Sequence, residues 1–471
     1  MMTKKEVYSH TEALCPKCRR KVQARIVQVN HRVEMEKFCP DHGYSSVLIS
    51  TDVVWYQQSR QYVKPKQKPL DVSVKNYRGC PDSCGMCPEH QQHTCLPVVE
   101  ITGRCDLNCP ICLKNRSVIS DMSTTDFGLI LDTLLRTEGK IDVLNISGGE
   151  PTMHPDLASL LELAAAKGVL QTTVSTNGRA LVRHKPLRDL FKKFDAIVAL
   201  QFDGFERETY RLLRGKDLAD EKRSLIELLE SEGIKYSLVA TVANGINDGE
   251  ITGMVDFFFR SKALSLMFQP ATYTGNAAAF KETAAPLTIS DVVREAGKSS
   301  FVHPGDFNPL PCSHYSCFAL SYYFAVEPGS YVSLKQVLGE ERFLETIANR
   351  TLPGLDREGL GLFKERLYEM WSAADSAGTN EKILKRIKSL LSLMNETGFD
   401  SRKAMDLGFE SMKSVFIHHF MDVDTMDLGR LIRCCNVYPQ KDGRLIPMCA
   451  QNVFFQQENE SDVFTATHLS G

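Results

Sequence analysis

The cysteines of this chain occur in groups on either side of a long cysteine-free stretch, and this arrangement constrains the fold more than any other feature. There are 15 cysteines, and none lies between residues 112 and 312. In a reducing compartment, closely spaced cysteines are typical of metal sites or catalytic thiols rather than disulfides. The pattern therefore predicts metal-binding modules on both sides of a cysteine-free scaffold.

Composition and charge exclude several classes of protein. The chain has 471 residues, 43% of them hydrophobic, and a formal net charge of -2. Nucleic-acid binding requires a basic face, so no nucleic-acid partner is expected. The first residues, MMTKKEVYSH, lack the apolar segment of a signal peptide, and no run approaches the roughly 18 apolar residues of a membrane span. We expect a cytoplasmic protein.

Residues 97–275 alternate between apolar, β-branched runs and helical stretches. The runs are PVVEIT, DVLNIS, LQTTVS, AIVALQF, YSLVATV and LSLMFQP. This repetition predicts an α/β fold with a parallel sheet, and about six repeats fit a partial (β/α)6 TIM-like barrel rather than a closed barrel of eight. The expected regions are a metal ribbon at 1–62, an auxiliary iron–sulfur module at 63–96, the barrel at 97–275, and a C-terminal substrate and auxiliary-cluster region at 276–471.

The N-terminal region carries two short metal-binding knuckles. Cys15 and Cys18 form the first, and Cys39 and His42 form the second. Their spacing is that of a zinc ribbon. These four residues are candidate ligands of one mononuclear zinc or iron ion. Cys39 either pairs with His42 or takes a later cysteine as the fourth ligand.

A different metal pattern follows the first strand of the barrel. Cys105, Cys109 and Cys112 have the spacing C-x3-C-x2-C. A [4Fe–4S] cluster normally takes four cysteines, so three thiolates leave one iron free for an exogenous ligand. The alternative is a zinc knuckle whose fourth ligand comes from elsewhere.

These residues resemble the signature of the radical S-adenosylmethionine (SAM) superfamily, C-x3-C-x-aromatic-C, with Ile111 in place of the aromatic residue. The second strand ends in Gly148-Gly149-Glu150-Pro151, which is similar to the GGEP motif of that superfamily. The resemblance implies a barrel of the radical SAM type and a turn that binds the amino group of SAM. Glycines suit that role because they let the backbone approach a ligand closely.

The resemblance extends to three polar residues at later strand ends. Ser175 and Asn177 follow the third strand, and Gln201 ends the fourth. It implies that they reach the ribose or carboxylate of SAM. The implied chemistry is reductive cleavage of SAM to a 5′-deoxyadenosyl radical, which abstracts hydrogen from an unactivated carbon. An external one-electron donor, such as a flavodoxin or ferredoxin, is then required.

The remaining cysteines predict two auxiliary [4Fe–4S] clusters. The first would be held by Cys80, Cys84, Cys87 and Cys95, which together supply four thiolates. The alternative, that this group binds SAM, is disfavoured because no GGE-bearing strand follows it at the right interval.

The second auxiliary cluster is expected near the C-terminus. Its predicted ligands are Cys312, Cys317, Cys435 and Cys449. Either Cys434 or Cys435 is expected to bind, because adjacent thiols rarely both ligate one cluster. Ordinary buried cysteines are the alternative interpretation.

The order of all these motifs is similar to one branch of the superfamily, the tetraether lipid synthases and class D radical SAM methylases. Asn436 departs from that pattern, which usually has a histidine-bearing stretch there. The resemblance implies a lipid biosynthesis enzyme that forms a C–C bond between alkyl chains. Its substrate would be hydrophobic and would bring it into peripheral contact with a membrane. The apolar stretch 318–326 would line the channel, although core packing explains it equally well.

Two other functions remain open. The first is a class D methyltransferase that transfers a folate-borne one-carbon unit to a pterin-like small molecule. The second is a non-catalytic iron–sulfur electron-transfer protein. The turn at 148–150 argues against the second, because an electron carrier has no use for a SAM-binding loop.

Overall fold

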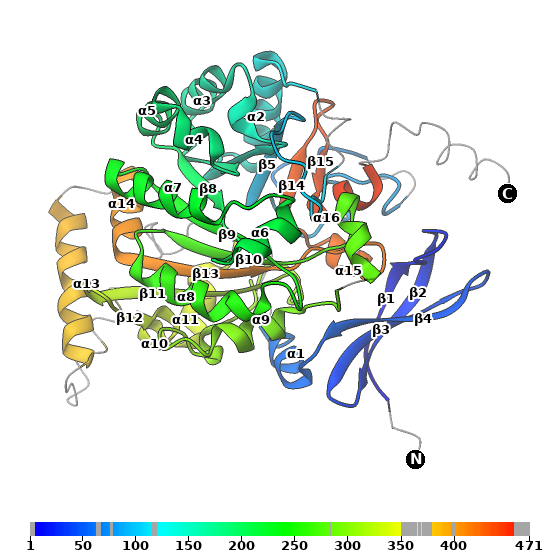
Figure 1. Cartoon of the computed structure of the whole chain (residues 1–471). Helices are drawn as coiled ribbons and strands as arrows, with labels where there is room; N and C mark the ends of the chain where they lie inside the picture. Colours follow the sequence, from blue (N-terminus) through cyan, green and yellow to red (C-terminus); the bar gives the residue numbers. More distant parts are fainter. Residues whose placement is uncertain are drawn as a thin grey trace.

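The structure, a computed structural model, describes residues 5–62, 67–75, 79–114, 120–282, 284–349, 379–396 and 401–455, together with the single residues 365 and 369. Within these residues, an 11-stranded sheet forms the centre of the molecule, in the order β12-β11-β13-β10-β9-β8-β7-β6-β5-β14-β15 (Figure 1). The strands are β5 (Leu96–Thr102), β6 (Val143–Gly148), β7 (Gln171–Thr176), β8 (Ile197–Gln201), β9 (Tyr236–Val242), β10 (Ser265–Pro270), β11 (Phe318–Glu327), β12 (Ser330–Ser333), β13 (Met412–His418), β14 (Asn436–Pro439) and β15 (Leu445–Pro447).

Strands β5 to β10 run parallel to one another and correspond to the six predicted apolar runs. The α/β fold class is therefore confirmed. A connection between parallel neighbours needs a crossover, usually a helix, and helices follow most of these strands. The helices of the barrel are α2 (Thr124–Glu138), α3 (Leu157–Ala166), α4 (Arg179–Arg183), α5 (Lys185–Lys193), α6 (Arg207–Arg214), α7 (Ala219–Glu232), α8 (Ile251–Arg260) and α9 (Ile289–Ala296).

The helix boundaries follow from local chemistry, as α2 illustrates. The Ser123 side chain accepts a hydrogen bond from the Asp126 backbone amide at 3.0 Å and so caps the first turn. The helix ends at Gly139, whose φ of 76° suits a residue without a Cβ atom. No helix in the described part of the chain combines the length and apolar composition needed to cross a bilayer.

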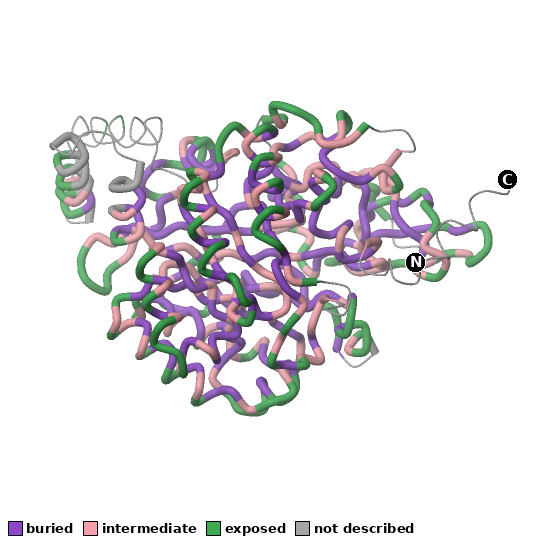
Figure 2. Tube along the Cα trace, turned by 90° about the horizontal axis from the view of Figure 1, so that it is seen from above, coloured by how far each residue is buried: buried purple, intermediate pink, exposed green. Residues whose placement is uncertain are grey.

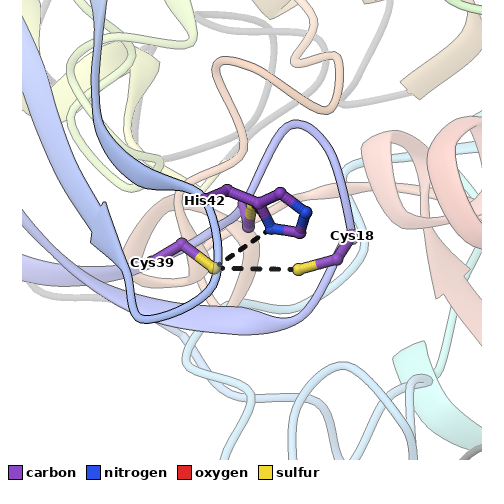
Figure 3. Close-up of side chains that lie close together, drawn as sticks. Cys18, Cys39 and His42 are labelled. Atoms are coloured by element: carbon purple, nitrogen blue, oxygen red, sulfur yellow. Dashed lines mark hydrogen bonds between the residues drawn. The ribbon is translucent and has the colours of Figure 1, made fainter.

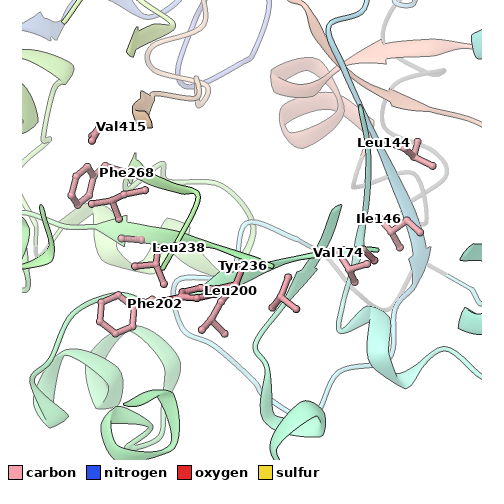
Figure 4. Packing of buried hydrophobic residues seen from close by; sticks show 14 of the residues in the cluster. Leu144, Ile146, Val174, Leu200, Phe202, Tyr236, Leu238, Phe268 and Val415 are labelled. Carbon is pink, nitrogen blue, oxygen red and sulfur yellow. The ribbon is translucent and has the colours of Figure 1, made fainter. Parts of the chain in front are cut away.

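The main core lies between the sheet and these helices. Leu144, Ile146, Val174, Leu200 and Phe268 are fully buried there (Figure 4). Buried residues run through the centre of the molecule, whereas exposed residues lie mainly at its periphery (Figure 2). Because successive side chains of a strand point to opposite faces, the residues between these core positions face the inner side of the sheet.

Segments from the predicted C-terminal region complete both edges of the parallel sheet. β13 pairs in parallel with β10, and β14 pairs in parallel with β5. The region at 276–471 is thus built into the same sheet as the barrel. An uncovered strand edge would expose unpaired backbone groups, and β13 and β14 supply hydrogen-bond partners for the edges of β10 and β5. The remaining helices are α10 (Leu334–Leu338), α11 (Glu340–Ile347), α13 (Thr379–Glu396), α14 (Ser401–Ser411), α15 (Leu428–Leu431) and α16 (Met448–Ala450).

The N-terminal ribbon is a separate four-stranded antiparallel sheet, followed by α1 (Val53–Ser59). Its strands are β1 (Glu6–Leu14), β2 (Lys21–Val29), β3 (Arg32–Cys39) and β4 (Gly43–Ser50). Polar contacts join the ribbon to segments that pack around the 11-stranded sheet. Thr11 donates to the Asp427 carboxylate at 2.6 Å, and Thr51 donates to the Asp291 carboxylate at 2.7 Å.

Candidate active site

A cavity of about 560 Å³ lies on the inner face of the parallel sheet. Alternate residues of β6 to β10 line it. The last inward-facing residue on each of these strands is polar: Ser147, Ser175, Gln201, Thr241 and Gln269. Because the carboxyl ends of parallel strands meet at one edge, these residues give the cavity a polar rim where such folds place their ligands.

Cys105, Cys109 and Cys112 line the same cavity, on the loop that follows β5. Burial raises the pKa of the Cys109 thiol. A buried thiol forms its thiolate readily only beside a cation or a metal. Three thiols at the wall of one cavity would fit the ligand set of a [4Fe–4S] cluster that leaves one iron for an exogenous ligand.

The predicted glycine turn holds the cysteine loop in place. The Gly149 amide donates to the Thr102 carbonyl at 2.7 Å. A Cβ atom on Gly149 would lie 2.3 Å from the Arg104 carbonyl oxygen, and one on Gly148 would lie 2.4 Å from the Thr102 carbonyl oxygen. Only glycine fits this close approach of two backbones. The contact explains why the turn follows the cysteines by one strand.

Glu150, the acidic residue of the turn, is buried and bound by protein groups. One carboxylate oxygen accepts hydrogen bonds from the Thr152 amide and hydroxyl and from the Thr176 hydroxyl, at 3.1, 2.6 and 2.6 Å. The other accepts from the Asn177 amide at 2.7 Å. Burial raises the pKa of Glu150, and these hydrogen bonds oppose the rise. In this structure Glu150 ties the end of β7 to the turn after β6.

Ser175, Asn177 and Gln201, which the sequence resemblance places near SAM, all line the cavity. Their polar atoms are paired with other protein groups. Ser175 donates to Asn145 at 3.0 Å, Asn177 donates to Asp106 at 2.7 Å, and Gln201 accepts from a buried lysine of α7 at 3.0 Å. Their contacts with SAM stay a prediction.

The part of the cavity wall that β11 and β13 supply is mainly apolar and aromatic. Phe318 and Tyr322 come from β11, and Phe416 and His418 come from β13. The Phe318 and His418 rings stack with centroids 3.9 Å apart. Burial lowers the pKa of His418 to about 3, so its ring is neutral near pH 7. The predicted apolar stretch therefore both packs in the core and faces the cavity.

The four predicted ribbon ligands lie together at the end of the N-terminal sheet. The ligand atoms of Cys15, Cys18, Cys39 and His42 are all within 4.8 Å of one another. Figure 3 shows the side chains of Cys18, Cys39 and His42 directed toward one another. The His42 Nδ1 atom is 3.6 Å from the Cys15 sulfur and 3.5 Å from the Cys39 sulfur. Burial would raise the pKa of Cys39, but hydrogen bonds from His42 lower it to about 7. Three sulfurs and one imidazole fit a tetrahedral zinc site.

Comparison with known proteins matches both parts of this architecture. Residues 99–258 match the Radical SAM superfamily, and residues 7–51 match the HMPTM N-terminal zinc ribbon domain. The chain is a radical SAM enzyme. Its N-terminal domain is a zinc ribbon.

One relative of this radical SAM enzyme is similar over nearly its whole length. The 7,8-dihydro-6-hydroxymethylpterin dimethyltransferase of Methanocaldococcus jannaschii is 29% identical over 484 residues, covering 96% of this chain and 94% of that enzyme. The probable GTP 3',8-cyclase of Methanothermobacter marburgensis is 30% identical over 167 residues, covering 34% of this chain and 52% of that enzyme. Streptococcus suis SuiB bound to the precursor peptide SuiA is 20% identical with a TM-score of 0.38, covering 44% of this chain and 46% of that chain.

The structure does not bring the auxiliary cysteines of the enzyme together in the two sets of four that the sequence predicts. Cys80, Cys84 and Cys87 lie near one another and interact electrostatically. Burial raises the pKa of Cys80 to about 12, so this thiol would ionise only when it binds a metal. Cys95, the predicted fourth ligand, contacts other cysteines instead.

Cys95 forms side-chain hydrogen bonds with Cys312 and Cys435. Its sulfur is also 3.7 Å from His93 Nε2. The contact with Cys95 lowers the pKa of Cys312 to about 7. The Asn349 amide donates to the Cys312 sulfur at 3.2 Å. Sequence spacing alone missed this group because its members are brought together only by the fold.

Cys317 and Cys449 lie beside the buried Arg430 side chain, and Cys434 lies near both of them and near Cys435. The pKa of Arg430 is raised by Cys317 and Cys449 against the effect of burial, and Cys434 interacts electrostatically with both cysteines. Burial raises the pKa of Cys449 to about 11. Cys434 therefore belongs to this candidate metal site, and Cys435 belongs to the one that includes Cys95. The sequence prediction used only Cys435.

Sequence reasoning missed two basic residues beside the cavity, the buried Lys222 and the partly buried Arg214. Lys222 on α7 is the lysine that contacts Gln201, and it also donates to the Asn177 carbonyl at 2.5 Å. Arg214 at the end of α6 lines the cavity. Both occur in charged helical segments that are typical of solvent-exposed faces, so the sequence offered no signal for either.

Proposed function

We propose that this radical SAM enzyme is a methyltransferase that acts on a pterin-type heterocycle. The observation that carries the proposal is similarity to a pterin dimethyltransferase over 96% of this chain and 94% of that enzyme. The match includes the ribbon and the C-terminal region as well as the barrel. It favours the methyltransferase hypothesis over the coupling of lipid alkyl chains.

The cavity supports the same substrate class. Asn145, Thr173, Ser237 and Ser265 line it from β6, β7, β9 and β10, in addition to the polar rim. A heterocycle with several ring nitrogens and a carbonyl can exchange hydrogen bonds with polar groups of this kind, whereas a long alkyl chain can make none with them. The flat aromatic pair of Phe318 and His418 offers one side of such a ring a stacking surface.

Cys105, Cys109 and Cys112 are the residues that would hold the SAM-binding [4Fe–4S] cluster. When bound, the cluster and SAM together supply the 5′-deoxyadenosyl radical. The chain's own residues position that pair: Gly148 and Gly149 fix the cysteine loop, and Glu150 fixes the neighbouring strand end. The buried apolar wall excludes water from the reacting atoms.

The three other cysteine groups are proposed auxiliary iron–sulfur sites, one more than the two that the sequence spacing predicts. One of them opens on the substrate, because Cys95 and Cys435 line the same cavity as the SAM-binding cysteines. That placement suits electron transfer to or from the substrate or an attachment point for it. An external one-electron donor would reduce the SAM-binding cluster.

The test is an anaerobic assay with SAM, dithionite, a folate one-carbon donor and 7,8-dihydro-6-hydroxymethylpterin. Mass spectrometry would follow methylated pterin, and a parallel reaction with a diether lipid would follow alkyl dimers. The proposal expects methylated pterin and 5′-deoxyadenosine, both absent with a Cys105→Ala variant. Alkyl dimers without methylated pterin would restore the lipid hypothesis and overturn the proposal.

A further inference from the structure

The cavity runs from the predicted SAM-binding cysteines to the opposite end of the parallel strands. Its lining includes Val143, Gln171 and Ile197, which are the first residues of β6, β7 and β8. Strand β7 has six residues, so its two ends are about 17 Å apart at the usual rise of roughly 3.3 Å per residue. Because the cysteine loop follows the carboxyl end of β5, the amino ends of the strands form the far end of the cavity.

Four uncharged polar side chains line this far end, and we refer to them as the deep end of the cavity: Gln171, Ser237, Ser265 and Ser414. Ser265 begins β10 and pairs in register with Ser414 of β13, and Ser237 is the second residue of β9. In the part of the chain that the structure describes, no protein group forms a hydrogen bond with the three serine hydroxyls. These hydroxyls are therefore available to a ligand.

Gln171 is 1% exposed and is held in a single orientation. Its Nε2 atom donates to the Thr172 carbonyl at 3.0 Å and to the Asp195 carbonyl at 2.8 Å. Two carbonyl acceptors on one side identify that atom as the amide nitrogen. The Oε1 atom is then a buried acceptor, and it has no hydrogen-bond partner among the described residues. Such an acceptor costs about 1–3 kcal/mol when it stays unpaired, and an N–H group of a ligand would remove that cost.

The chemistry of these four side chains selects one kind of ligand. Each hydroxyl can donate or accept, whereas Gln171 Oε1 can only accept. No charge is present in this set, so it suits a neutral group rather than a phosphate or a carboxylate. A ring edge that carries an N–H group beside a carbonyl or ring nitrogen matches the set, and an alkyl chain can make no hydrogen bond with any of its members.

We propose that the deep end binds the aminopyrimidinone edge of the substrate heterocycle. Gln171 Oε1 accepts a hydrogen bond from an N–H group of that edge, and the serine hydroxyls contact its carbonyl and ring nitrogens. This assignment rests on the pterin-type substrate proposed above. The second ring of the substrate then faces Cys105, Cys109 and Cys112, so the deep end determines which part of the heterocycle is presented to the radical.

The test is calorimetric titration of the intact enzyme, prepared anaerobically with SAM but without reductant. The two ligands are 7,8-dihydro-6-hydroxymethylpterin and its analogue without the 2-amino group. The proteins are wild type, a Ser237→Ala/Ser265→Ala double variant, Gln171→Leu and Ser321→Ala. Ser321 is the matched control, because it is a buried serine of β11 whose two neighbours, Leu320 and Tyr322, line the cavity, so its own side chain faces away.

Each lost hydrogen bond is expected to raise the Kd for the pterin by about two- to tenfold. The double-serine variant should therefore bind the pterin about tenfold more weakly, without a lower urea midpoint, because its hydroxyls contact no protein group in the described part of the chain. Gln171→Leu should weaken binding of the pterin by about tenfold and leave binding of the analogue unchanged, a difference that a purely structural role would not produce. Ser321→Ala should bind both ligands as wild type does.

Wild-type affinity for the pterin in the double-serine variant would overturn the assignment, since the deep end would then hold only water. Equal weakening of both ligands by Gln171→Leu would overturn it as well. Should Gln171→Leu fail to fold, the double-serine variant alone decides the outcome. A different failure belongs to the proposed function: wild type itself would then bind neither ligand, and the assignment would fall with the substrate class.

Discussion

Substituting Gly149 with alanine tests whether the glycine turn positions the cysteine loop. The added Cβ atom would lie 2.3 Å from the Arg104 carbonyl oxygen and 2.8 Å from the Gly103 carbonyl oxygen. Carbon and oxygen atoms normally approach to about 3.3 Å, so the loop must move by about 1 Å. Both obstacles are backbone atoms, which cannot rotate away as a side chain would.

Such a displacement has two measurable consequences. Overpacking of this kind costs about 1–3 kcal/mol of folding free energy. A misplacement of about 1 Å at a reacting centre lowers the rate by about a hundredfold. Gly149→Ala should therefore lower the rate of 5′-deoxyadenosine formation by about that factor, with a smaller loss of stability in urea unfolding.

Gly249→Ala is the matched control, because no atom lies within 4 Å of a Cβ added there. It should leave SAM cleavage and stability unchanged. Anaerobic measurements of iron content, urea midpoint and 5′-deoxyadenosine formation would compare the three proteins. Wild-type cleavage by Gly149→Ala at wild-type stability would refute the reasoning, since it would mean that the loop tolerates the shift.

Three further predictions concern the surroundings of the site. Lys413→Met should flatten the pH dependence of stability. Burial lowers the pKa of Lys413 from 10.5 to about 8, so in this pH range the unfolded state of the wild type binds more protons than the folded state. The free energy of unfolding of the wild type should therefore rise by about 2 kcal/mol between pH 8 and pH 9.5, as urea midpoints would show. Cys39→Ser should remove the ribbon zinc, detected by metal analysis, and lower the thermal midpoint while leaving the iron content unchanged; retained zinc would contradict the four-ligand site. Lys222→Met should lower the free energy of unfolding by about 1–3 kcal/mol, because the Asn177 carbonyl and Gln201 lose their donor. It should also raise the KM for SAM. An unchanged KM would mean that the hydrogen bonds of Lys222 do not support the cofactor site.

The parts of the fold that sequence could predict are those with local patterns. The strand at 236–242 alternates buried and less buried residues and appears at its predicted position. The loop at 105–112 and the turn at 148–150 are short motifs, and their closeness follows from neighbouring parallel strands. These features depend on residues near one another in the chain.

The parts that could not be predicted depend on distant contacts. β13 joins β10 although the described chain between them includes two other strands of the same sheet. Cys95 contacts Cys312 and Cys435 rather than Cys80, Cys84 or Cys87, and no spacing rule covers such a separation. The partly buried Arg214 and the buried Lys222 donate hydrogen bonds to Asp203 and Gln201, partners that only the fold brings to them.

The most direct test of the central claim is to quantify 5′-deoxyadenosine and iron in wild type and in the variant with Cys105, Cys109 and Cys112 all replaced by alanine. Anaerobic preparation with Mössbauer spectroscopy would count the clusters in each protein. We predict that the variant loses one [4Fe–4S] cluster and all formation of 5′-deoxyadenosine, while the zinc and the other iron–sulfur sites persist. Cleavage of SAM at the wild-type rate by this variant would contradict the account.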